Sequence, residues 1–174
     1  MELALLSSTK IVTTGKPTTI KANPGRRTAR VSERASAQTR YIESSALLAA
    51  LLEGDSGARQ VIRASGRRVT SALTLAEANR AVIRARTTGR LTFAEERDAI
   101  SGLQTFARRC EIIAVSDEIL TRAGRPFPIE PIRTLDAIHL ATVELLSEPP
   151  SLLIFVTRDK RVADNARALG YSIA

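Results

Sequence analysis

The amino-acid sequence predicts an α/β protein of the doubly wound type, in which helices cover both faces of a central parallel sheet. From residue 40 onward, short apolar runs alternate with segments of helical periodicity. Strands that are joined through helices pair in parallel, because a parallel neighbour requires a crossover connection. In addition, the run SLLIFV at 151–156 lacks polar alternation, as expected of a strand buried on both faces.

Glycines end two of the predicted helices in the first part of this alternation. Residues 40–44 are predicted to form a strand, followed by a helix at 45–54 that Gly54 ends. A second strand at 67–71 is followed by helices at 73–89, which Gly89 ends, and at 92–109.

The second part contains a proline-rich interruption. A strand at 111–115 and a short helix at 116–123 precede the segment 124–133, which carries three prolines and is predicted to be a loop. The remaining elements are a helix that starts at 133, a strand at 151–157, a helix at 159–169 that Gly170 ends, and a short strand at 171–173.

The composition restricts the classes of function. A length of 174 residues suits one domain, and an aromatic content of 3% excludes base stacking as the main binding mode. The single cysteine, Cys110, cannot form an internal disulfide or a zinc cluster, so a cytoplasmic location is expected. No apolar run approaches the ~18 residues that cross a bilayer, and the first residues do not resemble a secretory signal. We therefore expect no membrane partner.

The net charge of +8 is concentrated in residues 1–40, which hold eight Lys or Arg and two Glu. Such a basic, Ser/Thr-rich arm can bind nucleic-acid phosphates, but a flexible solvated tail is the expected interpretation. A transit peptide or a misplaced translation start would give a similar composition. The sequence thus divides into an arm at 1–40 and a folded domain at 41–174.

Four acidic residues are candidates for a common site, because ligands of such sheets bind beyond the carboxyl ends of the strands. Glu43 ends the first strand and Asp159 follows the strand at 151–157, while Glu77 and Asp136 lie near the starts of their helices. Two carboxylates ~4 Å apart repel by roughly 4 kcal/mol at an effective dielectric of 20. A divalent cation bound between the carboxylates replaces this repulsion with attraction to the ion, and an all-oxygen cluster selects Mg²⁺ or Mn²⁺ over zinc. Convergence of the four would indicate metal-dependent phosphodiester hydrolysis.

Two of the acids have a capping alternative. Asp159 can be the N-cap of the helix that follows it, a common role worth about 1 kcal/mol. Asp136 can follow a Thr134 N-cap and interact with the helix dipole, although its neighbours on the helical wheel, Leu140 and Val143, are apolar. These alternatives remain open at the level of sequence.

The other two acids have a solvent-exposed alternative. Glu77 shares a helical face with Arg80 and Arg84, which is typical of a solvated, salt-bridged surface. Glu43 can be an ordinary loop acid in front of a serine that caps the next helix.

Other polar residues have mainly structural interpretations. His139, the only histidine, lies three residues after Asp136 in an apolar helix and is expected to be a hydrogen-bonded core residue. Cys110, near the end of a predicted helix, is expected to have only a packing role. The arginines of the two middle helices can touch RNA, but solvated faces are expected for Arg80, Arg84, Arg86, Arg90, Arg108 and Arg109.

Four segments give the sequence a family resemblance: YIESSALLAALL at 41–52, SALTLAEANRAV at 71–82, RTLDAIHLATVELL at 133–146 and VTRDKRVADNARALGY at 156–171. In order and spacing they resemble a PIN domain, in particular a VapC-type toxin ribonuclease of a toxin–antitoxin pair. The resemblance implies a PIN-like doubly wound fold of three layers and an acidic pocket for Mg²⁺ or Mn²⁺ that serves endonucleolytic RNA cleavage. It also implies a cognate VapB-like antitoxin and a homodimer.

The resemblance implies a role for individual residues. The acids carried over are Glu43, Glu77, Asp136 and Asp159, of which Glu43, Asp136 and Asp159 would be metal ligands, with Ser45, Thr157 and Arg158 as supporting or substrate-binding residues. Glu43 departs from the family pattern, which most often has Asp at this position. The added methylene moves the carboxylate by about a bond length, whereas metal sites tolerate only a few tenths of an ångström.

Three functions compete at this stage. The first is a Mg²⁺-dependent endoribonuclease toxin. The second is a catalytically silent PIN module that binds RNA or a protein partner, motivated by Glu43 and the basic arm. The third, a phosphatase with an aspartyl nucleophile, is disfavoured because the first strand ends in Glu-Ser-Ser rather than an Asp-x-Asp pair.

Overall fold

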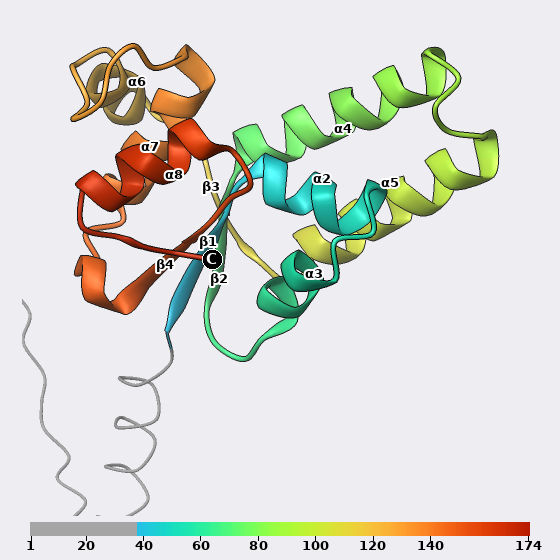
Figure 1. The fold of residues 1–174 in the computed structure, drawn as a ribbon, viewed down its shortest axis with the longest axis horizontal. Helices are drawn as coiled ribbons and strands as arrows, with labels where there is room; N and C mark the ends of the chain where they lie inside the picture. Colours follow the sequence, from blue (N-terminus) through green and yellow to red (C-terminus); the bar gives the residue numbers. More distant parts are fainter. Residues whose placement is uncertain (1–37) are drawn as a thin grey trace, which may run out of the picture. The chain divides into compact units, whose positions relative to one another are not determined.

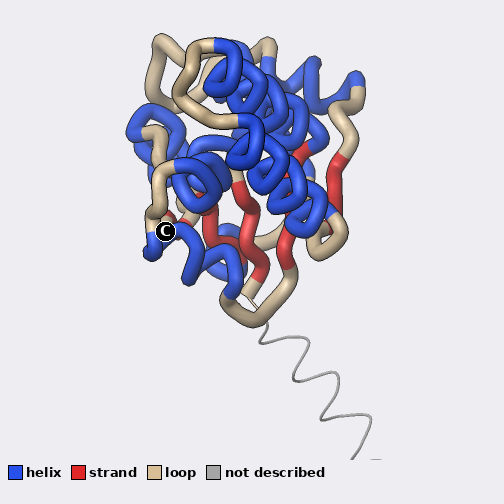
Figure 2. Tube along the Cα trace, turned by 90° about the vertical axis from the view of Figure 1, so that its right-hand side faces the viewer, coloured by secondary structure: helices blue, strands red, loops and turns tan. Residues whose placement is uncertain are grey.

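A computed structural model describes residues 38–174 of the protein. Five parallel strands form one sheet in the order β3-β2-β1-β4-β5, and helices lie on both of its faces (Figures 1 and 2). The strands are β1 (Thr39–Ile42), β2 (Arg68–Ser71), β3 (Glu111–Ile113), β4 (Leu153–Val156) and β5 (Ser172–Ile173). The predicted doubly wound α/β fold is confirmed.

The two central strands divide the core into two layers. Tyr41 pairs with Phe155 and Ile42 with Val156 across the β1–β4 ladder. Since successive side chains of a strand point to opposite faces, the first pair packs beneath α6 (Asp117–Ala123), α7 (Thr134–Leu145) and α8 (Lys160–Ala168). The second pair packs beneath α2 (Ser44–Leu52), α4 (Ala72–Thr87) and α5 (Phe93–Ala107).

The strands run almost directly into helix N-caps. Glu43 follows β1 and caps α2, Ser71 ends β2 and caps α4, and Asp159 follows β4 and caps α8. Because β1, β2 and β4 are parallel neighbours, these helix N-termini gather at one edge of the sheet. Their positive dipole ends favour negative charge at this edge.

One helix was not predicted. The segment SGARQVIR forms α3 (Ser56–Arg63), which Asp55 caps through Ala58 N. The segment is amphipathic, with Ala58, Val61 and Ile62 at helical spacing, but it is only eight residues long and polar on average, and Ala58 is its one fully buried residue. Tertiary contacts decide the helix instead: Arg59 Nε donates to Ala50 O in α2 at 2.7 Å.

The first strand begins one residue earlier than predicted, because Thr39 pairs with Leu153 of β4. Residues 1–37 of the predicted basic arm lie outside the described residues. Within residues 38–174, no helix is both long and apolar enough to cross a membrane.

Candidate functional site

Glu43 lies buried at the carboxyl end of β1, with 4% of its surface exposed. Its Oε1 accepts a hydrogen bond from Ser44 Oγ at 2.5 Å. Its Oε2 accepts from Ser45 N at 3.0 Å, from Ser45 Oγ, and from Thr157 Oγ1 at 2.9 Å. A buried carboxylate is tolerated only when hydrogen bonds replace its hydration, and these four donors supply them. Glu43 is therefore a fixed acidic group rather than a loop acid.

Two hydroxyl groups connect Glu43 to the end of β4. Ser45 Oγ accepts from Arg158 N at 2.8 Å and from Asp159 N at 3.1 Å, and Thr157 Oγ1 accepts from Asp159 N at 3.0 Å. The Arg158 side chain is engaged elsewhere, since its Nε lies 2.7 Å from Asp55 Oδ2. That hydrogen bond lowers the pKa of Asp55. Arg158 thus contacts the site through its backbone N–H.

Asp159 has the predicted capping role. Its Oδ1 accepts from Arg161 N at 2.8 Å and from Val162 N at 3.2 Å. Both cap bonds use one carboxylate oxygen, so Oδ2 is available to a ligand. Capping and a place at the site are compatible for this residue.

Among the four candidate acids, Asp136 has a buried oxygen, Oδ2, that finds no hydrogen-bond partner within the described part of the chain. Burial raises the pKa of Asp136, and the charges of Asp159 and Glu43 raise it further, whereas Arg133 and Arg161 lower it. A buried carboxylate oxygen without a partner favours the binding of a proton or a cation.

The capping alternative for Asp136 is wrong. Arg133 occupies the N-cap position of α7 and makes no side-chain cap bond, while Thr134 is the first residue of the helix. No hydroxyl cap therefore precedes Asp136, whose position in the first turn still allows an interaction with the helix dipole.

Glu77 is not part of a solvated, salt-bridged face, and that alternative is also wrong. Its side chain is only 23% exposed, and its Oε2 lies 2.7 Å from His139 Nε2. His139 is 1% exposed, and its Nδ1 is hydrogen-bonded to the Tyr41 hydroxyl at 2.8 Å. The prediction of a hydrogen-bonded core histidine is confirmed. Ligand atoms of Glu43, Glu77 and His139 all lie within 4.8 Å of one another.

The structure brings two of the predicted acids, Glu43 and Glu77, into one close group with His139. The backbone N–H of Asp159 reaches the Ser45 and Thr157 hydroxyls that hold Glu43. Asp136 is related to these acids through the effect of the Asp159 and Glu43 charges on its pKa. Sequence reasoning missed that His139 holds Glu77, although an isolated histidine in an apolar helix was the available signal.

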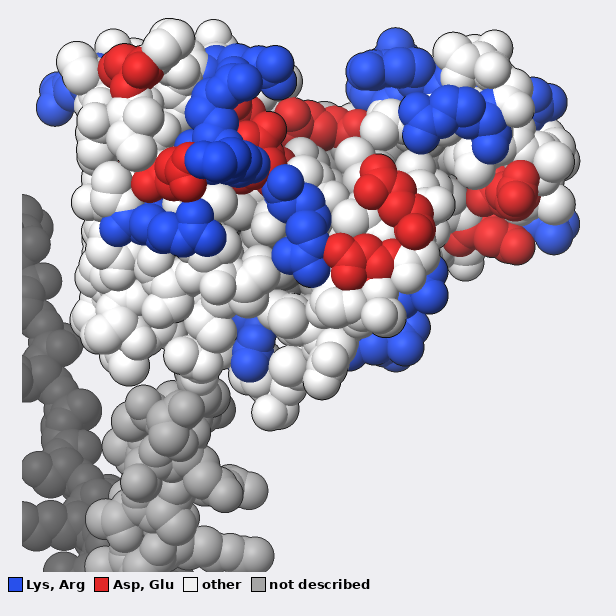
Figure 3. Space-filling view, viewed as in Figure 1, with Lys and Arg blue, Asp and Glu red and all other residues white. Residues whose placement is uncertain are grey.

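The remaining predictions concern the arginines of the two middle helices and Cys110. The six arginines at positions 80, 84, 86, 90, 108 and 109 are all exposed, as predicted. Cys110 packs against the second core layer, and burial raises the pKa of its thiol to about 11, so it is not a reactive thiolate at neutral pH. Figure 3 shows Lys and Arg side chains beside acidic ones over the region of α7 and α8.

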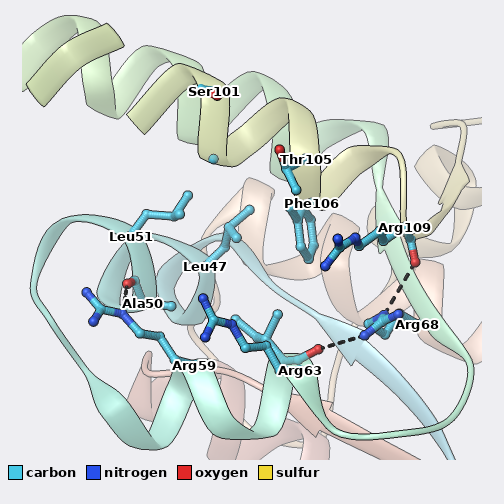
Figure 4. A pocket seen from close by; sticks show the side chains of 12 residues that line it. Leu47, Ala50, Leu51, Arg59, Arg63, Arg68, Ser101, Thr105, Phe106 and Arg109 are labelled. Atoms are coloured by element: carbon cyan, nitrogen blue, oxygen red, sulfur yellow. Dashed lines mark hydrogen bonds between the residues drawn. The ribbon is translucent and has the colours of Figure 1, made fainter. Parts of the chain in front are cut away.

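Away from the acids, a hollow with a volume of about 290 Å³ lies among α2, α3 and α5. Apolar side chains form its floor, and four arginines surround it (Figure 4). They are Arg59, Arg63, Arg68 and Arg109, and the lining contains no acidic side chain. Within the described part of the chain, no ion pair involves any of these four guanidinium groups. We call this hollow the arginine groove.

Comparison with known proteins agrees with this fold and site. A sequence model of the PIN domain matches residues 40–168. Ribonuclease VapC46 of Mycobacterium tuberculosis is 35% identical over 139 residues, which cover 76% of this chain and 94% of that protein. Ribonuclease VapC35 of the same organism is 31% identical over 137 residues, which cover 76% and 93%.

Solved structures show the same fold. The VapBC2 structure from Rickettsia felis, bound to a promoter DNA fragment, matches with a TM-score of 0.55 at 13% identity and covers 78% of this chain and 97% of that one. DNA-bound VapBC from Salmonella typhimurium matches with a TM-score of 0.53 at 15% identity, covering 79% and 97%.

The fold and the site define a class of α/β domains that carry a carboxylate cluster at the carboxyl edge of a parallel sheet. The chain belongs to the PIN domain family and, within it, to the VapC type.

Proposed function

We propose that the protein is a Mg²⁺-dependent endoribonuclease that acts as a toxin in the cytoplasm and is neutralised by a cognate VapB-like antitoxin. The observation that carries this proposal is the buried Oδ2 of Asp136, which has no hydrogen-bond partner among the described residues, on a carboxyl group whose pKa is raised by burial and by the charges of Asp159 and Glu43. The names of the relatives, Ribonuclease VapC46 and VapC35, support the same activity. In this proposal residues 41–174 form the nuclease domain and residues 1–40 a basic arm.

The donor set fits a hard divalent ion. Glu43, Asp136 and Asp159 would hold Mg²⁺ or Mn²⁺, because these ions prefer oxygen ligands and the cluster contains no cysteine. Such an ion would lower the pKa of an attacking water and stabilise the leaving oxygen of the phosphodiester. Glu77 would complete the acidic group. Glu43 fits despite its extra methylene because Ser44, Ser45 and Thr157 fix its carboxylate in one orientation.

The residues around the acids have supporting roles in this proposal. The hydroxyls of Ser45 and Thr157 hold the β1 and β4 ends together. Arg158 fixes the backbone after β4 and joins it to Asp55. Arg133 and Arg161 lie close enough to lower the pKa of Asp136 and would attract the phosphates of RNA to an otherwise acidic pocket.

The arginine groove supports the proposal that the protein binds a protein partner. Apolar side chains favour an amphipathic segment, and four guanidinium groups without a carboxylate partner in residues 38–174 favour acidic side chains on it. We propose that an acidic, apolar segment of the antitoxin occupies this groove. The VapBC complexes with the same fold support an antitoxin partner, and a homodimer is proposed from the family resemblance alone.

Metal removal tests the enzymatic part of the proposal. The purified protein should cleave RNA internally, lose this activity in EDTA, and regain it with Mg²⁺ or Mn²⁺. Asp136→Asn should lower the cleavage rate by more than about 100-fold, because the loss of supporting residues alone typically lowers activity by 10- to 100-fold. Asp98→Asn, at an exposed position on α5, is the matched control and should cleave normally. EDTA-resistant cleavage, or an active and folded Asp136→Asn variant, contradicts the proposal.

A catalytically silent PIN module is the second candidate. It is favoured by Glu43, because both carboxylate oxygens already accept hydrogen bonds within the chain. In that case the protein would bind RNA without cleaving it in Mg²⁺ or Mn²⁺. Glu43→Asp, which restores the family's usual residue, should then confer cleavage if Glu43 is what silences the site. An inactive Glu43→Asp variant of an inactive parent would leave the enzyme hypothesis without support.

A further inference from the structure

A buried polar chain runs beneath the acidic site, from β1 through α7 to α4. Tyr41 is fully buried, and its hydroxyl is hydrogen-bonded to His139 Nδ1 at 2.8 Å. His139 Nε2 lies 2.7 Å from Glu77 Oε2. The Tyr41 ring packs against Phe155 with the ring centroids 5.1 Å apart. A polar chain inside an apolar core is stable only when every member has its partners, so each link constrains the next.

The chemistry of the three groups fixes the direction of the hydrogen bonds. A carboxylate only accepts, so the proton between Glu77 and His139 belongs to Nε2. In neutral imidazole the second nitrogen is then an acceptor, and the Tyr41 hydroxyl donates to Nδ1. Both ring nitrogens are therefore used inside the chain, which leaves none to bind a metal ion.

We infer that His139 is a positioning residue for Glu77 and not a metal ligand. Glu77 comes from α4, whereas Glu43 follows β1, and His139 on α7 lies between them: its Nε2 is 3.9 Å from Glu43 Oε1. By binding Glu77 Oε2, His139 orients the other carboxylate oxygen of Glu77 for an external ligand. The Glu77 carboxylate sets the tautomer of His139, and Tyr41 holds the ring orientation through Nδ1. This role in ion binding rests on the proposed function, whereas the hydrogen-bond pattern does not.

Mn²⁺ affinity of the RNA-free protein tests the inference. Glutamine at position 139 retains an amide N–H donor for Glu77, whereas leucine has none. His139→Leu should weaken Mn²⁺ binding by about 10- to 100-fold, the usual effect of losing a residue that orients a ligand. His139→Gln should remain within about threefold of the unmodified protein, and Tyr41→Phe should lie between the two. Thermal unfolding of each variant checks that the fold persists.

Two results overturn the inference in this experiment. If His139→Gln loses as much affinity as His139→Leu, the imidazole itself is a ligand. If a folded His139→Leu variant binds Mn²⁺ normally, His139 has no positioning role. RNA cleavage gives a further check, because rescue by Gln but not Leu should appear in the turnover number at saturating Mn²⁺.

The single histidine of the chain allows a test that needs neither metal nor RNA. Long-range ¹H–¹⁵N NMR of the unmodified protein should show one imidazole signal, with the proton on Nε2 and none on Nδ1. Glu77→Gln should shift the Nε2 signal, and Tyr41→Phe should shift Nδ1. A proton on Nδ1 would overturn the inference even in a protein without any metal or nuclease activity. Absence of RNA cleavage with the expected NMR pattern would instead contradict only the proposed function.

Discussion

The acidic site and the arginine groove hold charges of opposite sign that do not pair with each other. At the site, Asp136 has a buried oxygen without a partner; around the groove, four guanidinium groups have no carboxylate partner among residues 38–174. Helix α2 contributes to both regions. Glu43 caps the N-terminus of this helix, and the helix residues Leu47, Ala50 and Leu51 form part of the groove floor. The fold thus keeps unpaired charges apart, which leaves each region able to bind a ligand of the opposite charge.

The two regions differ in how their charges are held. Glu43 is buried and fixed by hydroxyl and backbone donors from two strand ends. Two of the groove arginines donate to backbone carbonyls: Arg59 to Ala50 O, and Arg68 to Ile62 O and Arg109 O. A rigid acidic set suits an ion that requires fixed ligand distances. Long arginine side chains without carboxylate partners among the described residues suit a peptide whose acidic side chains can pair with them.

Among the variants that compare ligand binding in the two regions, the largest effect is expected in the groove. Arg63→Glu should weaken binding of an acidic antitoxin segment by about 100-fold, because it replaces attraction with like-charge repulsion at the partner's acids. Calorimetric titration with the cognate antitoxin measures this change. Arg97→Glu, at an exposed position on α5 outside the groove lining, changes the net charge equally and should have little effect. Equal loss in both variants would show that overall charge, not the groove, determines binding.

An intermediate effect is expected from the hydroxyls that fix the acids. Ser45→Ala removes a donor to Glu43 and one of the two acceptors for Asp159 N, so it should raise the dissociation constant for Mn²⁺ about tenfold. Ser44→Ala removes a donor to Glu43 alone and should have a smaller effect. Isothermal titration of both variants compares them directly. If Ser44→Ala proves the more damaging, the link between the two strand ends is not what organises the site.

The smallest expected effect is on stability without metal. Burial and the Asp159 charge raise the pKa of Asp136 above its ordinary value of 3.8, so ionisation of this group destabilises the fold. The penalty is absent at low pH and develops as the pH rises through 3.8 to the higher pKa of the folded protein. In EDTA, Asp136→Asn should therefore be the more stable protein at pH 7, and its advantage should shrink as the pH falls towards 3.8.

Urea unfolding at several pH values measures this difference. Saturating Mg²⁺ should reverse the order at pH 7, because an ion that binds only the folded state stabilises the unmodified protein. If the unmodified protein is instead more stable than Asp136→Asn in EDTA, the charge of Asp136 is compensated by other groups of the chain.

The amino-acid pattern determined the layered α/β architecture, because the difference between strand and helix periodicity survives in a single sequence. It also indicated Glu43 and Asp159, since both directly follow apolar strands and parallel strands end at one edge of a sheet. Helix α3 was not predicted, because eight residues with only three apolar side chains at helical spacing are too few to distinguish a helix from a polar connection.

Only the tertiary structure decided between the alternatives for Glu77 and Asp136. Helical spacing groups Glu77 with Arg80 and Arg84, but His139, 62 positions further along the chain, binds it. Asp136 loses its capping explanation because α7 begins one residue earlier than a Thr134 cap requires. Periodicity describes the neighbours of a residue on its own element, whereas the compensation of a charge depends on side chains that other elements bring to it.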